Sequence, residues 1–372
     1  MKKSPPTPPN MTVRVITQRT EEPRTTHIMR RGDFLQPMDE VEPGTLQVLH
    51  SLEEKPNKTT RLGLVDWLFS EENPLTPRVT VNQVWEKLLG KGIVTTINDF
   101  GLRGDAPTHP ELLDWLATEY RRLGWSRKEF IKTIVMSATY RQASIHRAEF
   151  DEIDPLNKLL HRQNRLRVEA EIVRDLSLQA SGLLSKKVGG PSVFPSLPPD
   201  IAALSYANNF KWETSTGEDR YRRGMYTFFK RTAPHPNLIN FDCPDSNTTC
   251  LSRRTSNTPL QALQALNNDT FHQAAIQLAR RLLTAEGNSD EDRLASMIML
   301  TSSRPIESIE RQAYLDLLNE SRAWYTDHPE AATELTEGME VEPIEGISPT
   351  EFAAWVATSR IALNLDDFFT RP

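Results

Sequence analysis

Apolar residues recur at helical spacing over most of the chain after Arg61. Stripes of this period lie at residues 112–123, 131–138, 271–282 and 352–359. Gly124 follows the first stripe, as expected at a helix C-terminus. The pattern predicts a mainly α-helical fold of two helical lobes, over residues of about 60–184 and 256–372. A bridging loop region, residues 185–255, is expected between them.

Helix starts carry a second, independent signal. In a capping box a Ser or Thr oxygen accepts from the N3 amide, and the N3 Glu or Gln bonds back to the cap. The pattern occurs at Thr108–Glu111, Ser126–Glu129, Thr258–Gln261 and Ser348–Glu351. Asp269 is expected to cap the helix that runs on to Leu282.

Short runs rich in β-branched or aromatic residues favour a small β element. They lie at residues 12–19, 26–32 and 225–231. Residues 31–45 contain Pro and Gly and are predicted to be a loop, and the Pro-rich residues 1–11 a disordered leader. Because the runs have no other evident partner, we expect residues 225–231 to pair with the N-terminal strands.

Composition narrows the class of protein. The 372 residues are 38% hydrophobic and 25% charged, which is typical of a globular chain. The net charge of -6 argues against a general nucleic-acid partner, because phosphate binding needs clustered cations. No apolar run approaches the roughly 18 residues of a membrane span. The first residues, MKKSPPTPPN, lack the apolar core of a signal peptide.

Residues 222–271 are the most informative part of the chain, because they are rich in Arg, Asp, Asn and Thr, show little helical periodicity and contain both cysteines. Irregular backbone cannot satisfy its own polar groups, so such a segment is ordered by side-chain hydrogen bonds. It is therefore either a binding surface or an internal polar network. The candidate site residues are Arg231, His235, Asp242, Asp245, Arg253, Arg254, Asn267 and Asp269.

We expect opposite charges in this polar loop to pair with one another. The predicted network consists of Arg231, Asp242, Asp245, Arg253 and Arg254, and fixes the loop against the helix start at Thr258. Carboxylates near a helix N-terminus gain from its unpaired amides and its dipole.

Catalysis is the alternative for the same residues. Asp242, Asp245 and Asp269 with His235 and His272 could form a hydrolytic or metal centre. No paired histidines at helical spacing and no Gly-x-Ser-x-Gly motif support it.

Two arginine pairs, Arg222-Arg223 and Arg253-Arg254, could instead bind an anion, or pair with carboxylates such as Asp242, Asp245 and Asp219. Trp67, Trp85, Trp115, Trp125 and Trp355 lie on helical stripes and are expected in the core. Trp212 lies in a polar segment, where it could stack on a sugar ring or shield the interior from solvent.

Cys243 and Cys250 are the only cysteines. A loop this short can close a disulfide in an oxidising compartment, so the pair is a disulfide candidate. Two unpaired thiols are the other possibility. No metal site is expected, because histidines at zinc-site spacing are missing.

An ordered series of short motifs extends over the chain. They are Asn82-Gln-Val-Trp85, Asn98-Asp-Phe-Gly101, Thr108 to Ala117, Met136 to Gln142, Gln163-Asn-Arg165, Glu169-Ala170, Arg174-Asp175, Gly189 to Ser192, Lys230-Arg231, His235-Pro236, Phe241-Asp242, Pro244-Asp245, Asn257 to Leu263 and Asn267. Together they resemble the C-terminal domain of unknown function in large planctomycete surface proteins that carry cytochrome-c-like modules. The resemblance extends from about Thr12 to Pro372, so residues 12–372 are expected to be a single family domain.

The resemblance implies an exported or cell-surface setting, with a protein or polysaccharide partner at the cell envelope. Relatives often have two adjacent histidines where this chain has Lys87 and Leu88, which argues against a metal or haem-linked role at that position. No Cys-x-x-Cys-His occurs, so no haem cofactor is expected. The resemblance also implies that the chain is a separated or truncated part of a larger multidomain protein.

Two functions follow as hypotheses. The first is a non-catalytic binding or scaffold module of an extracytoplasmic assembly. The second is a hydrolase acting on a saccharide or ester through carboxylates of residues 231–272.

Overall fold

The computed structural model describes residues 15–17, 24–52, 61–203, 211–285, 289–336 and 342–371. The predicted leader and most of the strand-like run at residues 12–19 lie outside these ranges. The chain forms two compact units, residues 1–84 with 109–132, and residues 85–108 with 133–372. These bounds differ from those of the predicted lobes, and the division into lobes stays a prediction.

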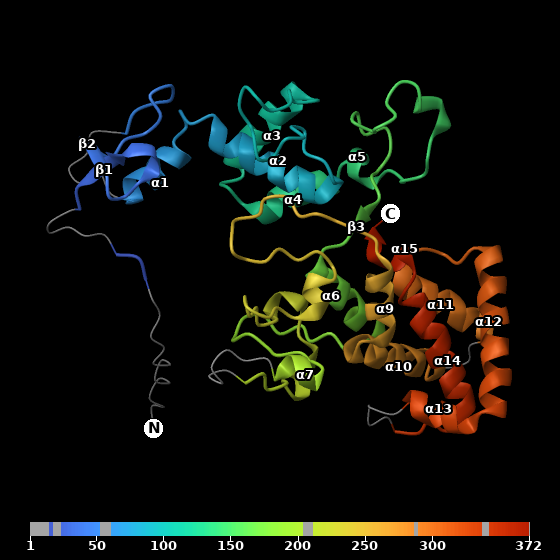
Figure 1. The fold of residues 1–372 in the computed structure, drawn as a ribbon. Coiled ribbons are helices and arrows are strands. Elements are labelled where there is room, and N and C mark those ends of the chain that lie inside the picture. The colour runs from blue at the N-terminus through green and yellow to red at the C-terminus, as the bar shows by residue number, and fades with distance from the viewer. Residues whose placement is uncertain are drawn as a thin grey trace, which may run out of the picture. The chain divides into compact units, whose positions relative to one another are not determined.

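The first unit contains a β-hairpin and short helices (Figure 1). The hairpin joins β1 (Thr26–Met29) to β2 (Pro37–Val41) through a 3-10 turn at Arg30–Gly32. The helices are α1 (Arg61–Phe69), α3 (Pro110–Arg122) and parts of α2 (Leu75–Leu89) and α4 (Arg127–Val135). The prediction that residues 31–45 form a loop was therefore wrong in part, since β2 lies within them.

Aromatic rings and one arginine stabilise this first unit. Tyr120 packs against Trp125 and Phe130, with ring centroids 5.2 and 4.9 Å away. Arg121 of α3 donates to the backbone oxygens of Ser70, Glu71 and Asn73. These bonds tie α3 to backbone oxygens of the turn that follows α1.

The second unit is a helical assembly. Its helices are α5 (Ala138–Arg141), α6 (Ala170–Ser181), α7 (Pro199–Ala202), α8 (Pro236–Ile239), α9 (Pro259–Asn267), α10 (Asp269–Leu283), α11 (Asp290–Ser302), α12 (Ser308–Asp327), α13 (Pro329–Thr336), α14 (Pro349–Ala362) and α15 (Asp366–Phe369). The strands β3 (Leu166–Arg167) and β4 (Thr370–Arg371) form a small two-stranded antiparallel sheet. The chain is therefore mainly α with a small β element, as predicted.

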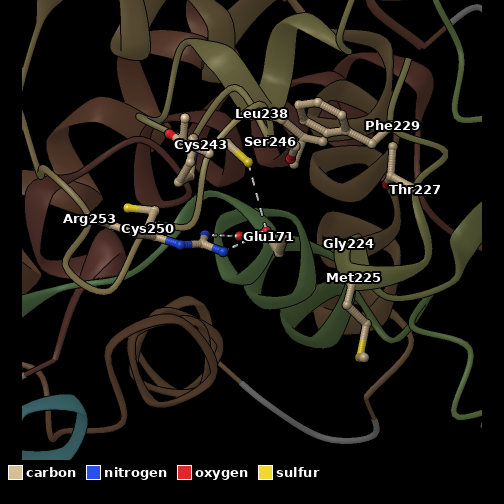
Figure 2. A pocket seen from close by; sticks show the side chains of 12 residues that line it. Glu171, Gly224, Met225, Thr227, Phe229, Leu238, Cys243, Ser246, Cys250 and Arg253 are labelled. Atoms are coloured by element: carbon tan, nitrogen blue, oxygen red, sulfur yellow. Dashed lines mark hydrogen bonds and ion pairs between the residues drawn. The ribbon is translucent and has the colours of Figure 1, made fainter. Parts of the chain in front are cut away.

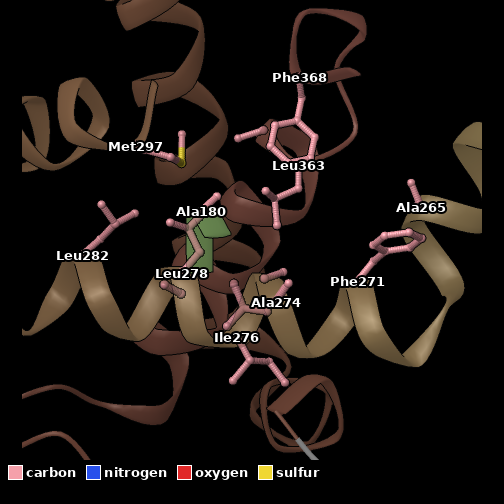
Figure 3. Packing of buried hydrophobic residues seen from close by; sticks show 14 of the residues in the cluster. Ala180, Ala265, Phe271, Ala274, Ile276, Leu278, Leu282, Met297, Leu363 and Phe368 are labelled. Carbon is pink, nitrogen blue, oxygen red and sulfur yellow. The ribbon is translucent and has the colours of Figure 1, made fainter. Parts of the chain in front are cut away.

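The core of this unit forms around α10, which packs against α6 and α14. Ala274, Ala275, Ile276, Leu278 and Ala279 of α10 are completely buried (Figure 3). Small alanines let neighbouring helices approach closely, while the larger side chains fill the spaces between them. α14 also packs against α12 and α13 and contributes the fully buried Trp355.

Local helix signals were mostly confirmed. Ser126, Thr258 and Ser348 each accept a hydrogen bond from the N3 amide at the predicted helix starts. Two predictions were wrong by one residue. His109, not Thr108, precedes α3, and the Thr108 hydroxyl donates to the backbone oxygen of Ile93. Asn268, not Asp269, caps α10.

The predicted pairing of residues 225–231 with the run at residues 26–32 was also wrong, and most of the run at residues 12–19 lies outside the described residues. β1 pairs with β2, and Thr227 forms an isolated bridge with Val193 within the bridging region. Residues 224–226 form a 3-10 turn (Gly224–Tyr226) where a strand was expected.

Tryptophan positions follow the prediction only in part. Trp85 and Trp355 are buried, but Trp115 is 54% exposed. Trp212 is buried, donates its ring N–H to the Pro195 oxygen, and packs edge-on against Phe194. This geometry excludes sugar stacking on Trp212 and supports the solvent-shielding alternative. Among the described residues, no helix is both long enough and apolar enough to cross a membrane.

Gly224 is a position where backbone approaches backbone. A Cβ there would lie 2.4 Å from the Glu171 oxygen and 2.8 Å from the Glu171 Cα of α6. Its backbone angles are not in the left-handed region. The glycine is therefore required by contact with α6, not by turn conformation.

We predict that Gly224→Ala lowers the free energy of unfolding by at least about 1–3 kcal/mol, because backbone must shift to admit the methyl group. Gly44→Ala is the matched control, since a Cβ at Gly44 meets nothing within 4 Å. That variant should stay within about 0.5 kcal/mol of the parent. Equal unfolding curves for both variants in urea would contradict the close approach.

Candidate functional site

Helix α6 contains a buried cation that organises residues 220–222 of the bridging loop region. Arg174 is 4% exposed and donates from Nε to the Arg222 oxygen at 3.2 Å and from Nη2 to the Arg220 oxygen at 2.6 Å. Its Nη1 donates to the Thr270 hydroxyl at the start of α10. Burial lowers the pKa of Arg174 to about 10, against the opposing effect of Asp175, so the guanidinium remains charged at neutral pH.

The neighbouring carboxylate binds the same segment from the other side. Asp175 accepts from the Gly224 amide at 2.6 Å and from Arg223 Nε at 2.8 Å. Consecutive residues of α6 thus fix residues 220–224 through charge-assisted hydrogen bonds, which are stronger than neutral ones.

Arg222 is a second buried arginine and serves an internal role. It is 1% exposed, donates to the backbone oxygens of Pro191, Lys187 and Gly189, and lies over the Tyr226 ring at 3.7 Å. For Arg222 and Arg223 we had predicted either an anion site or ion pairs with Asp242, Asp245 or Asp219. Both predictions were wrong. Carbonyl oxygens hold Arg222, and Asp175 holds Arg223.

A pocket of about 340 Å³ opens beside α6, and we call it the α6 pocket (Figure 2). It is lined by Glu171, Gly224, Met225, Thr227, Phe229, Leu238, Cys243, Pro244, Ser246, Thr248, Cys250 and Arg253. Its volume falls near the lower end of small-ligand pockets, roughly 300–1,000 Å³. The pocket therefore has room for a small ligand or for one residue of a longer one.

A bidentate ion pair forms the polar side of the α6 pocket. Arg253 donates to both carboxylate oxygens of Glu171, at 2.6 and 3.2 Å, and lies 3.4 Å from Glu169. Burial raises the pKa of Glu171, but the Arg253 hydrogen bonds and charge outweigh it and hold the pKa below its usual range. Glu171 is therefore an anion at neutral pH and cannot act as a general acid.

Both cysteines lie in this pocket as free thiols. The Cys243 sulfur lies 3.8 Å from a Glu171 oxygen, and Cys250 is exposed (Figure 2). Burial, with the nearby Glu171 charge, raises the pKa of Cys243 to about 11. The Cys243 thiol is therefore protonated at neutral pH and is a poor nucleophile.

The predicted carboxylates do not converge on this pocket. Asp242 accepts from the Ser256 amide and hydroxyl, both at 2.7 Å, and from Gln261. Asp245 is exposed and accepts from the backbone and side chain of Asn247, which lowers its pKa. Asp269 begins α10 and pairs with Arg220 at 3.1 Å.

His235 is buried and caps α8. Its Nδ1 accepts from the Asn237 amide and its Nε2 lies 3.2 Å from the Ser196 oxygen. Burial lowers the pKa of His235 to about 4, so the ring is neutral at pH 7. Its ring nitrogens are occupied by backbone groups, which leaves no free base for catalysis.

The predicted internal network was correct only in part. Asp242 does join the loop to Ser256 and Gln261 at the start of α9. Arg231, Arg254, Asn267 and Asp245 are exposed instead. Arg253 pairs with α6, not with the loop aspartates.

Sequence patterns did not single out Glu171 as a site residue, because its partner Arg253 lies 82 residues further along the chain. The available signal was the density of charge at Glu169, Glu171, Arg174 and Asp175. No group of three or more His, Cys, Asp or Glu side chains that could hold a metal occurs within the described ranges.

We predict that Asp242→Ala lowers the free energy of unfolding by about 1–3 kcal/mol, because the Ser256 amide loses its acceptor. Asp242 also has a φ of 64°, a conformation that Asn tolerates better than Ala. Asp242→Asn should therefore cost less than Asp242→Ala. Asp245→Ala, at an exposed turn, is the control and should unfold like the parent in denaturant titrations.

We also predict a pH dependence from His235. Its folded pKa lies below its unfolded value, so the unfolded state binds more protons and stability falls as pH drops from about 6.5 towards 4. Between pH 7 and pH 5 this loss is on the order of 2 kcal/mol. His235→Asn keeps a capping acceptor without titrating, so its unfolding free energy should fall less over this interval. Parallel pH profiles would argue against a depressed pKa.

Comparison with protein-family models assigns the chain to a family. A family model described as PSD1, a protein of unknown function (DUF1553), matches residues 60–318. Neither a curated protein nor a solved structure matches the chain. Helix α14 lies beyond the matched residues, although it packs into the same core as α10. The match extends over more than half of the chain and agrees with the motif series described above, and the chain therefore belongs to the DUF1553 family.

Proposed function

We propose that this protein is a non-catalytic binding module of an extracytoplasmic assembly, and that the α6 pocket is its ligand site. The observation that carries the proposal is the ion pair between Glu171 of α6 and Arg253, whose side chains remain 22% and 27% exposed, respectively. A polar pair set into a pocket is available to a ligand without a change of fold.

The chemistry of the pocket favours a neutral, hydroxyl-rich ligand. The two charges that line it, Glu171 and Arg253, cancel each other. A charged ligand would have to break their hydrogen bonds, whereas a sugar hydroxyl can donate to the carboxylate while keeping them. Thr227, Ser246 and Thr248 add hydroxyl groups to the lining.

Part of the lining is apolar. It consists of Met225, Phe229, Leu238 and Pro244. An apolar surface beside a few directed polar groups is typical of small-molecule sites and suits the mixed faces of a sugar ring. These features support a saccharide, as a part of an envelope polysaccharide or glycan, as the ligand class.

The hydrolase alternative has weaker support. Asp242, Asp245 and Asp269 are occupied by a backbone amide, an asparagine and an arginine, respectively. None of the three lines the α6 pocket, so they form no carboxylate pair there of the kind that glycosidases use. The α6 pocket contains one carboxylate, and the lining residues include no histidine.

We predict that Met225→Trp, which places a large ring in the pocket, weakens saccharide binding at least tenfold. Thr248→Val removes a lining hydroxyl and should weaken binding several-fold. Thr333→Val, on the exposed surface of α13, is the matched control and should bind like the parent. Envelope oligosaccharides would first be selected by their retention on a column that carries the immobilised parent protein. Their binding to each variant would then be measured by calorimetry.

Turnover would be followed in the same samples. Release of reducing ends or of acid from the oligosaccharide or ester panel would favour a hydrolase over a binding module. Retention without turnover, lost in the Met225→Trp variant and kept in Thr333→Val, is the expected result. Equal retention by Met225→Trp and the parent would place the ligand elsewhere on the chain.

A further inference from the structure

Both cysteines of the chain line one pocket, although no strand or helix holds them together. Cys243 and Cys250 are seven positions apart and both line the α6 pocket. Cys243 is half-buried beside Glu171, while Cys250 is exposed (Figure 2). One thiol is therefore open to a reagent in solution, and the other lies inside the pocket that their shared loop borders.

The loop between the two cysteines has few fixed contacts. The Cys243 amide donates to the Leu238 oxygen at 2.9 Å, and Asp245 bonds to Asn247 in a local turn. The Cys250 sulfur contacts the Ser252 oxygen at 3.1 Å. Residues 245–250 are exposed and contain no regular secondary structure. A change in their backbone would therefore break few bonds and leave α6 and α8 in place.

We propose that Cys243 and Cys250 form a reversible intramolecular disulfide, which closes residues 243–250 into a ring at the edge of the α6 pocket. The inference is independent of the ligand proposed above. An eight-residue ring is long enough for disulfide geometry once the two Cα atoms approach within about 7 Å.

The chemistry is exchange with a small-molecule disulfide such as oxidised glutathione. The exposed Cys250 thiolate attacks one glutathione sulfur, forms a mixed disulfide and releases one glutathione thiol. Cys243 then loses its proton, attacks the Cys250 sulfur of the mixed disulfide and releases the second glutathione thiol, a step that is slow because the Cys243 thiol is mostly protonated. The protein loses two protons and two electrons, and one glutathione disulfide is reduced to two thiols.

Oxidation would change the pocket as well as the loop. Cys243 is the thiol that contacts the Glu171 carboxylate, and a disulfide sulfur has no proton to donate. Glu171 would then retain its Arg253 hydrogen bonds alone. Because burial raises the pKa of Cys243 to about 11, the exposed Cys250 is the thiol that starts the exchange.

The full chain would be equilibrated in buffers with graded ratios of oxidised to reduced glutathione. Free thiols would then be blocked with an alkylating reagent, and the intact mass would be measured by mass spectrometry. We expect two alkylated cysteines at the reducing end, none at the oxidising end, and a monomer throughout. The oxidised form should melt several degrees higher, because the ring restricts the unfolded chain. Cys243→Ser and Cys250→Ser are the controls, and neither should show that shift.

Three outcomes would overturn the proposal. Both thiols could remain alkylatable in the most oxidising buffer, or the oxidised product could be a dimer linked between chains. A disulfide that no reduced-glutathione excess opens would contradict reversibility. Saccharide binding need not occur for any of these results, so the two proposals can fail separately.

Discussion

The buried guanidinium of Arg174 is the interaction on which the second unit depends. A desolvated cation is tolerated only when its donors are satisfied, and here two carbonyl oxygens and one hydroxyl accept from it. Those acceptors belong to the segment around residues 220–222 and to the first turn of α10. The need to satisfy one side chain of α6 therefore fixes where the irregular chain crosses the helix.

The close approach of Gly224 follows from the same arrangement. Once Arg174 and Asp175 hold the backbone of residues 220–224, that backbone lies against the Glu171 carbonyl. Only a residue without a side chain fits there. The following residue, Met225, then begins the wall of the pocket that Glu171 and Arg253 complete. Helix α6 therefore carries both the structural residues Arg174 and Asp175 and the candidate binding residue Glu171.

The polar loop illustrates how similar residues can serve different purposes. Asp242 and His235 satisfy backbone amides near helix starts, and burial keeps His235 neutral. Arg253 is different, because its charge is balanced by a carboxylate that remains partly exposed. A charge that closes a loop gives stability, whereas a charge pair that lines a pocket can also contact a ligand. Residue type alone does not separate these roles.

Local signals in the sequence determined the helices and much of their boundaries. Ser126, Thr258 and Ser348 cap helices as expected, because a capping bond spans only three residues. The apolar stripe at residues 271–282 is the buried face of α10, because helical periodicity is also a local property of the sequence. The ordered motifs were enough to indicate the family, which the comparison with family models shows.

Only the tertiary structure decided which polar groups meet. Arg253 pairs with Glu171 across 82 positions, and Arg165 and Arg167 pair with Asp367 and Asp366 across about 200. Trp115 lies on a helical stripe yet is exposed, while Trp212 lies in a polar segment yet is buried. Periodicity specifies which face of an element is apolar, but the packing of elements distant in sequence specifies what covers that face and which charges it brings together.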